Sequence, residues 1–249
     1  MGSEHEVYAT RSLKIHDVTS IELKELSAAS DLLDIMRNSD LCYFNEFLKN
    51  GGRMYEELEF FLECSTPECR SAMELVKYEK AFDRMLHFLR MEYERERKGS
   101  LMVTRNNRSP DGKSFCAHEN YLIKRSAMEY NSISKILPHL VTRIIYTGCG
   151  EIFDNKYVIS PRAMVIEEVI NSKTQSQRPF FNTGKEHYAG EDFYRIHGIT
   201  PDANMQETAA FLKYFTTSKI WKEIEFGDYT PVDFRILDPV REVKKISKN

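Results

Sequence analysis

The sequence lacks the features of several protein classes. No hydrophobic run approaches the roughly 18 apolar residues that a membrane span requires, and the N-terminus has no basic-then-apolar signal-peptide pattern. Thirty-five Lys and Arg against 38 Asp and Glu give a formal net charge of -3, and no block of basic residues forms a nucleic-acid footprint. We therefore expect a cytoplasmic protein that binds neither membranes nor nucleic acid.

Cysteine is scarce, and its spacing has no metal-site or disulfide pattern. The chain has 5 cysteines, an odd number, and none forms a C-x-x-C pair. A disulfide framework and a structural zinc site are therefore not predicted. Cys116, two positions before His118, could be a nucleophile, but it lies in an apolar alternating run where a buried thiol is the simpler interpretation. We expect all five thiols to be reduced and assign none of them a catalytic role.

The composition is that of a folded globular chain. Its 249 residues are 41% hydrophobic and 29% charged, which is enough to bury one large core or two small ones. No internal repeat or low-complexity linker divides the sequence. We therefore predict a single domain over residues 1–249, of the α+β class.

The hydrophobic pattern predicts strands and helices in turn along the chain. A polar loop over 106–114 contains a Pro-Asp-Gly turn, so we expect the strands on either side of it to form a hairpin. The expected strands are 2–9, 53–63, 101–104, 115–123, 157–160, 163–169 and 194–199. The expected helices are one capped by Thr19 or Ser20 that contains Leu23, Leu26, Leu33 and Met36 and ends near Asn38, and those over 71–98, 133–146 and 205–225.

Acidic and imidazole side chains recur at a spacing of two residues on these expected strands. Alternation places Glu4 and Glu6 on one face of the first strand, and it pairs Arg195 with His197 on a later one. A sheet face of this kind can hold hard cations and the phosphates that they bind. Each residue alone is more often a solvated charge or a hydrogen-bonded core histidine, so only the joint pattern indicates a site. The full set is Glu4, Glu6, Tyr55, Glu57, Glu63, His118, Arg195 and His197.

Segments along the whole chain resemble the bacterial Pup ligase and depupylase family, which is also described as proteasome accessory factor A-like. They keep the family's order and nearly its spacing, which is far more specific than any single motif. The segments are Gly2–Glu6, Gly51–Tyr55, Glu63–Cys69, Asn106-Asn107, His118–Leu122, Leu140–Arg143, Arg178-Pro179, Asn182-Thr183, Arg195–His197 and Asp202–Thr208.

The resemblance implies a fold and a set of metal ligands. This family is part of the carboxylate-amine ligase superfamily that includes glutamine synthetase, so a curved, mostly antiparallel β-sheet packed against helices is expected to hold ATP and magnesium ions. By resemblance, one ion is held by Glu4, Tyr55 and Glu63, and another by Glu6, His118 and His197. Because the second set contains imidazole, manganese is an alternative to magnesium there.

The resemblance also implies residues that bind the nucleotide. Arg162, in Ser160-Pro161-Arg162, occupies the place of a family arginine expected near phosphates, which a guanidinium can bind in bidentate fashion. Asn107 and Arg195 lie in matching segments and are expected to bind the cofactor as well. A further family arginine is replaced by Gly184, and the neighbouring Lys185 could supply a point charge in its stead.

Two other departures from the family concern the catalytic residue and the length. The family's catalytic aspartate is replaced by Glu57, which keeps the carboxylate and lengthens the side chain by one methylene. The sequence reaches Asn249 soon after Asp238–Arg241, a segment that resembles the end of the family's core domain. By resemblance the chain is therefore a short member that lacks the smaller C-terminal domain.

The function implied is that of an ATP- and Mg²⁺-dependent enzyme. It would activate a carboxylate as an acyl phosphate and join it to an amine, with Glu57 deprotonating or positioning that amine. The expected partners are ATP and either a small protein modifier or a small-molecule carboxylate and amine. A depupylase-like isopeptide hydrolase and a phosphotransferase are related alternatives. Gly184 and Glu57 would also suit a noncatalytic ATP-binding pseudoenzyme or a partner-binding protein, but the persistence of six presumptive metal ligands favours an enzyme.

Overall fold

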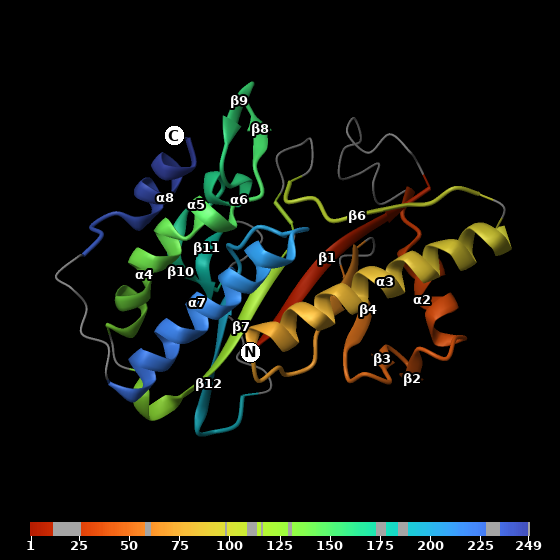
Figure 1. Cartoon of the computed structure of the whole chain (residues 1–249), viewed down its shortest axis with the longest axis horizontal. Helices are drawn as coiled ribbons and strands as arrows, with labels where there is room; N and C mark the ends of the chain where they lie inside the picture. Colours follow the sequence, from red (N-terminus) through yellow and green to blue (C-terminus); the bar gives the residue numbers. More distant parts are fainter. Residues whose placement is uncertain are drawn as a thin grey trace. The chain divides into compact units, whose positions relative to one another are not determined.

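A computed structural model of the chain, drawn in Figure 1, describes all but ten short segments of the sequence. The described residues fall into two compact units. The N-terminal unit comprises Gly2–Cys69 and Glu74–Ala117, and the C-terminal unit comprises Met1, Arg70–Met73 and His118–Asn249. The single domain predicted over 1–249 stays a prediction. The described ranges are 1–11, 26–57, 61–97, 99–108, 114–115, 117–128, 131–172, 178–183, 189–227 and 235–248.

The N-terminal unit is built on antiparallel strands that run in the order β1-β5-β4-β3-β2, with β6 also paired to β1. Helices α2 and α3 supply apolar side chains to a core shared with these strands, in which Leu32, Phe82 and Leu89 meet Val7, Met54 and Leu62. The strands are β1 (Gly2–Thr10), β2 (Cys42–Phe44), β3 (Phe47–Leu48), β4 (Arg53–Glu57), β5 (Phe61–Ser65) and β6 (Met102–Thr104), and the helices are α2 (Ala29–Arg37) and α3 (Ala72–Arg97).

Strand β1, the long helix α3 and the end of α2 agree with the sequence pattern, but three predictions for this unit are wrong. The expected strand over 53–63 is instead the hairpin of β4 and β5. The two strands expected to form a hairpin around the Pro-Asp-Gly turn do not pair with each other in the described part of the chain: β6 pairs with β1, and only an isolated antiparallel bridge joins Arg108 to Ser114. Leu26 is helical, but helix α2 begins only at Ala29, because Ser27 forms a bridge with Thr10 and separates the two. Thr19, Ser20 and Leu23 lie outside the described residues.

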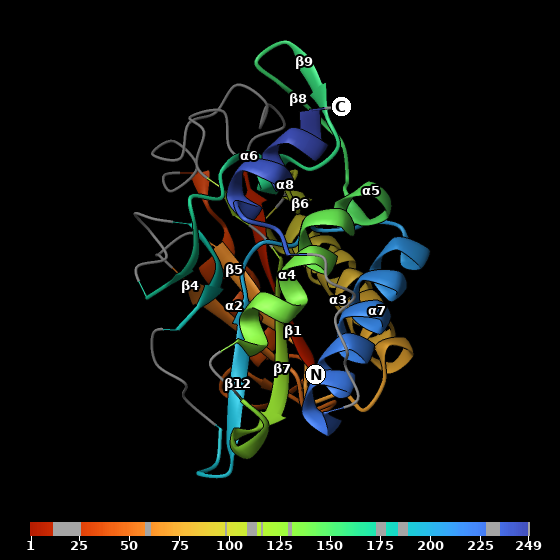
Figure 2. The same ribbon diagram turned by 90° about the vertical axis from the view of Figure 1, so that its left-hand side faces the viewer.

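The C-terminal unit contains strands in the order β10-β11-β12-β7, in which only β10 and β11 run parallel. Strands β7 and β12 lie side by side in Figure 2. The buried face of this pair packs Tyr121, Ile123 and Ile196 against Leu140 and Trp221 from the helices. The strands are β7 (Ala117–Lys124), β8 (Glu151–Phe153), β9 (Lys156–Val158), β10 (Glu168–Asn171), β11 (Pro179–Asn182) and β12 (Phe193–Gly198).

The helices of this unit are η2 (Arg125–Ala127), α4 (Ser132–Thr142), α5 (Ile144–Thr147), α6 (Pro161–Met164), α7 (Glu207–Phe226) and α8 (Pro239–Lys248). The helix expected over 133–146 is interrupted at Arg143, which separates α4 from α5. The strand expected over 163–169 begins instead as α6, because Pro161 suits the first helical turn and the Ser160 side chain caps it. The expected strand overlaps β10 only at Glu168 and Val169, and strands β8 and β11 and helix α8 were not predicted.

The fold class is confirmed as α+β. All strand pairs within the two units are antiparallel apart from β10 and β11, among the described residues. In the same residues, no helix has the length and apolar character that crossing a membrane would need.

Candidate active site: a carboxylate cluster and a histidine pair

The N-terminal unit gathers acidic side chains on one face of three neighbouring strands. Glu63 on β5 lies directly opposite Glu6 on β1 and directly opposite Tyr55 on β4. Directly opposed residues of an antiparallel pair point to the same side, and so do residues two apart on one strand. Glu4 and Glu57 therefore join this face. We call Glu4, Glu6, Tyr55, Glu57 and Glu63 the carboxylate cluster.

The side chains of the carboxylate cluster are close enough and buried enough to raise the pKa values of Glu63 and Tyr55. The side chains of Glu6 and Glu63 are buried, at 8% and 3% exposure. Burial, a hydrogen bond with Glu57, and the charges of Glu57, Glu4 and Glu6 raise the pKa of Glu63 to about 11. Burial and the nearby Glu63 carboxylate also raise the pKa of the Tyr55 hydroxyl. At neutral pH and without a cation, Glu63 therefore keeps a proton.

The donor atoms of the carboxylate cluster suit a hard divalent cation. Each glutamate offers carboxylate oxygens and Tyr55 offers a hydroxyl oxygen, and oxygen is the ligand type that Mg²⁺ and Ca²⁺ prefer. A cation would also offset the repulsion that otherwise keeps Glu63 protonated. The structure thus brings together Glu4, Tyr55 and Glu63, the set expected for one ion. Their coordination of an ion stays a prediction.

Arg53 contacts the edge of this cluster, a feature that sequence reasoning missed. Its guanidinium carbon lies 4.2 Å from the centre of the Tyr55 ring. The same group is 2.5 Å from Glu46 Oε2, an ion pair that holds it over the ring. The signal was present in the alternation of β4, where Arg53, Tyr55 and Glu57 share one face.

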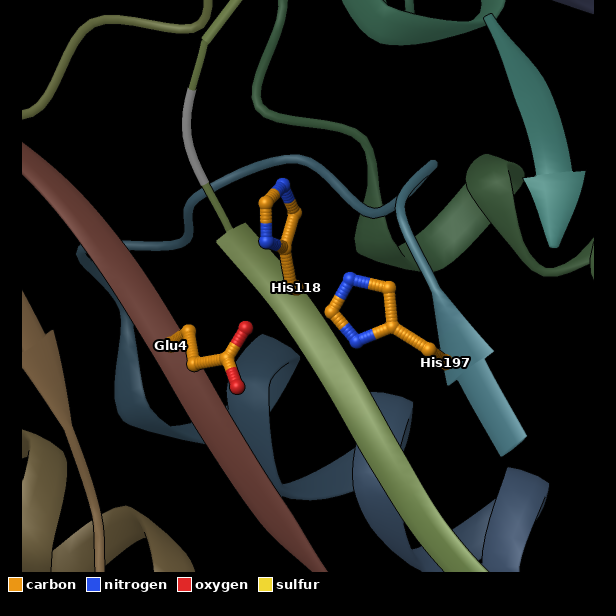
Figure 3. A group of neighbouring side chains, drawn as sticks. All are labelled: Glu4, His118 and His197. Carbon is orange, nitrogen blue, oxygen red and sulfur yellow. The ribbon is translucent and has the colours of Figure 1, made fainter. Parts of the chain in front are cut away.

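In the C-terminal unit, two histidines face each other across β7 and β12. Figure 3 shows the side chain of His118 on β7 and that of His197 on β12, and it also shows Glu4 on β1. The centres of the two imidazole rings are 5.0 Å apart, and the ring planes meet at 69°. Both histidines are half-buried, on the face of these strands opposite the apolar core. The structure thus brings the two histidines together, while their role as metal ligands stays a prediction.

Asn120 and Arg195 contact the ring of His197. Asn120 lies directly opposite His197 in the strand register, and its Oδ1 atom is 2.7 Å from His197 Nδ1. Arg195 donates from Nε to the same oxygen at 2.9 Å. Sequence reasoning expected Arg195 to bind the cofactor and gave Asn120 no role.

Behind the histidines, the other face of β7 contains a buried ion pair. Glu119 receives hydrogen bonds from the Arg143 guanidinium through both carboxylate oxygens and from the Tyr121 hydroxyl at 2.8 Å. Arg143 also donates to Thr217 Oγ1 at 2.6 Å, which connects β7 to helix α7. Glu119 and Arg143 are both 2% exposed. These buried contacts of Glu119 therefore fix the position of the strand segment that carries His118 and Asn120.

The remaining expected nucleotide-binding residues have other surroundings. Arg162 is buried, its guanidinium donates to the Ile199 carbonyl, and its backbone N–H donates to Asp202 Oδ1 at 3.1 Å. The backbone carbonyl of the buried Asn107 accepts from Phe115 N–H at 3.2 Å. Lys185 lies outside the described residues. A contact of these three residues with nucleotide stays a prediction.

Comparisons with known proteins place the chain in a family. The model of the family described as Pup-ligase protein matches residues 3–249. The Pup–protein ligases of Nocardioides sp. (strain ATCC BAA-499 / JS614) and Mycobacteroides abscessus are each 36% identical to it over 214 residues. Each match covers 82% of this chain and 47% of the relative, so the chain spans about half the length of these curated relatives.

Two solved structures share the fold. One is the crystal structure of the complex between the prokaryotic ubiquitin-like protein Pup and its ligase PafA, with a TM-score of 0.80 and 25% identity over 100% of this chain and 50% of that one. The other is the Pup ligase PafA in complex with ADP, with a TM-score of 0.72 and 29% identity over 96% of this chain and 52% of that one. With the family model matched over nearly its whole length, the chain belongs to the Pup-ligase protein family.

Proposed function

We propose that the chain is a cytoplasmic, ATP- and Mg²⁺-dependent enzyme of the Pup ligase type. It activates a carboxylate of a small protein modifier, Pup, as an acyl phosphate and joins it to an amine as an amide or isopeptide bond. The family membership supports this proposal, as do the relatives named Pup–protein ligase and the solved relative that binds ADP.

The carboxylate cluster is the observation on which the proposal chiefly rests. Four glutamates on one face, with Glu6 and Glu63 buried, repel one another, and this repulsion destabilises the fold when no cation balances it. A purely structural sheet face has no need of this arrangement. In the proposal Glu4, Tyr55 and Glu63 hold one divalent cation, and Glu6, His118 and His197 supply ligands to another. Bound Mg²⁺ would neutralise charge on the phosphoryl group that ATP transfers.

A residue of the chain then accepts the proton that the attacking amine loses. The carboxylate oxygen of the modifier attacks the γ-phosphorus of ATP, and ADP leaves. The amine nitrogen attacks the acyl carbon, phosphate leaves, and the amine proton passes to Glu57. Glu57 is hydrogen-bonded to Glu63 but is not one of the three residues proposed to hold the first cation, so its carboxylate is left to accept this proton. The extra methylene of Glu57 lengthens the reach of its carboxylate relative to that of an aspartate.

The test combines the protein with ATP, Mg²⁺, Pup and a lysine-containing acceptor protein, and follows ADP and new amide bonds by mass spectrometry. We expect both products with the unchanged chain and a fall in amide formation of about 10² to 10⁴ for Glu57→Gln. Glu56→Gln is the matched control, since Glu56 is the next residue on β4 and points to the other face, where it accepts from Ser30 Oγ at 2.8 Å.

Other outcomes would identify the alternatives. Release of Pup from a conjugate without net ATP consumption would indicate a depupylase-like hydrolase. A phosphorylated product without an amide bond would indicate a phosphotransferase. Binding of ATP with no product of either kind would indicate a noncatalytic nucleotide-binding protein and would refute the proposal.

A further inference from the structure

The carbonyl oxygen of Asn120 is the meeting point of two side chains on β12. His197 Nδ1 lies 2.7 Å from this oxygen, and Arg195 Nε donates to it at 2.9 Å. A guanidinium can only donate hydrogen bonds, so the Asn120 atom that it contacts must be the oxygen and not the amide nitrogen. Arg195 therefore fixes which way the Asn120 amide points.

The orientation of Asn120 determines where His197 holds its proton. An amide oxygen only accepts, so the Nδ1 atom facing it must donate. The neutral ring then has its hydrogen on Nδ1 and its lone pair on Nε2. Arg195 Nη2 is 3.3 Å from the same Nδ1, but it cannot donate to a nitrogen that bears a hydrogen, so the shorter contact with Asn120 prevails. Free histidine side chains favour the opposite tautomer, with hydrogen on Nε2.

We propose that Asn120 is a positioning residue that holds His197 as the Nδ1–H tautomer and thereby directs the Nε2 lone pair toward a divalent cation. Arg195 contributes indirectly, because it fixes the orientation of the Asn120 amide. This inference rests on the proposed function, in which His197 is a metal ligand. A histidine ligand commonly donates its other ring N–H to an oxygen acceptor, and this contact sets the ring's orientation and basicity.

A tautomer measurement tests the inference without any metal or activity. Protein labelled with ¹⁵N-histidine is studied by long-range ¹H–¹⁵N NMR at a pH where the rings are neutral, with His197 assigned by its loss in His197→Gln. We expect the Nδ1–H pattern for His197 in the unchanged chain. An Nε2–H pattern would overturn the inference at once, and this result needs no variant that might fail to fold.

Two Asn120 variants then separate positioning from packing. Asn120→Leu keeps the size and removes the acceptor, so His197 should shift toward the Nε2–H form. Asn120→Asp restores an acceptor oxygen and should restore the Nδ1–H form. A purely structural role would alter the stability of both variants and leave the tautomer of His197 unchanged, which would contradict the inference.

Metal binding supplies the link to function. Mn²⁺, followed by calorimetry or by its electron paramagnetic resonance signal, should bind about 10 to 100 times more weakly to Asn120→Leu than to the unchanged chain, and Asn120→Asp should recover most of this loss. Equal affinity in all three proteins would overturn the positioning role. If the unchanged chain shows the Nδ1–H form but binds no Mn²⁺, the proposed function fails while the tautomer assignment is supported.

Discussion

Replacing Glu63 by Gln should remove most of the alkaline sensitivity of the metal-free protein. Glutamine keeps the size of the side chain and its ability to hydrogen-bond Glu57, but it cannot ionise. In the folded protein the pKa of Glu63 is raised from an ordinary 4.5 to about 11 by burial and by the neighbouring glutamates. Between these values the folded state holds a proton that the unfolded state has released, so the free energy of unfolding falls as pH rises.

The magnitude follows from proton linkage. One proton changes the free energy of unfolding by about 1.4 kcal/mol per pH unit, which is about 2 kcal/mol between pH 7 and 8.5. This window avoids two other buried groups. The pKa of Asp202 is raised to about 6 and that of His139 is lowered to about 3. Above pH 7 both groups are therefore deprotonated in the folded and in the unfolded state, and neither changes the free energy of unfolding there.

Urea denaturation at pH 7 and at pH 8.5 in EDTA measures the effect. The unchanged chain should lose about 2 kcal/mol more than Glu63→Gln over this interval. Glu56→Gln, on the opposite face of β4, should behave like the unchanged chain. An equal loss in the unchanged chain and in Glu63→Gln would refute the conclusion that the carboxylate cluster keeps a proton when no cation is bound.

Three further predictions concern other parts of the chain. ATP and Mg²⁺ at about a hundred times the dissociation constant should raise the free energy of unfolding by roughly 2.7 kcal/mol, which corresponds to a rise of several degrees in melting temperature. Glu6→Ala and His197→Ala should abolish this rise. The same rise in both variants as in the unchanged chain would show that these residues bind no metal. Arg143→Met should lower the free energy of unfolding by about 3 to 5 kcal/mol in urea denaturation, because it leaves Glu119 buried without its partner, and a loss below about 1 kcal/mol would contradict this. Burial and the Arg143 charge lower the pKa of His139 to about 3, so below pH 6.5 the unfolded state binds a proton that the folded state does not. The free energy of unfolding should therefore fall with pH, by about 2 kcal/mol at pH 5 from this group. His139→Gln should lack this contribution to the loss of stability in acid.

Local patterns in the sequence predict much of the carboxylate cluster. Alternation alone places Glu4 and Glu6 on one face of β1, because a strand has a period of two. The same rule places Tyr55 and Glu57 together on β4. The sequence could not predict two antiparallel strands, β4 and β5, in place of one, since Leu58, Glu59 and Phe60 include no glycine, proline or asparagine to indicate a turn.

Pairing between distant segments is the part that local patterns cannot supply. The Pro-Asp-Gly turn suggested a hairpin, yet β6 pairs with β1, about a hundred residues earlier in the chain. The opposition of Asn120 and His197 likewise depends on the register of β7 against β12. The ion pair of Glu119 with Arg143 requires knowing which face of β7 meets the helices. Each of these contacts is fixed by tertiary packing and not by propensity.

The central claim, that the chain activates a carboxylate with ATP, is tested most directly by trapping the acyl phosphate. The protein is incubated with ATP, Mg²⁺, Pup and hydroxylamine, a nucleophile reactive enough to need no general base, and Pup hydroxamate and ADP are measured together. We expect equal amounts of the two, formed by the unchanged chain and also by Glu57→Gln, whose defect should be confined to lysine acceptors. ADP without hydroxamate, or neither product despite bound ATP, would contradict the account.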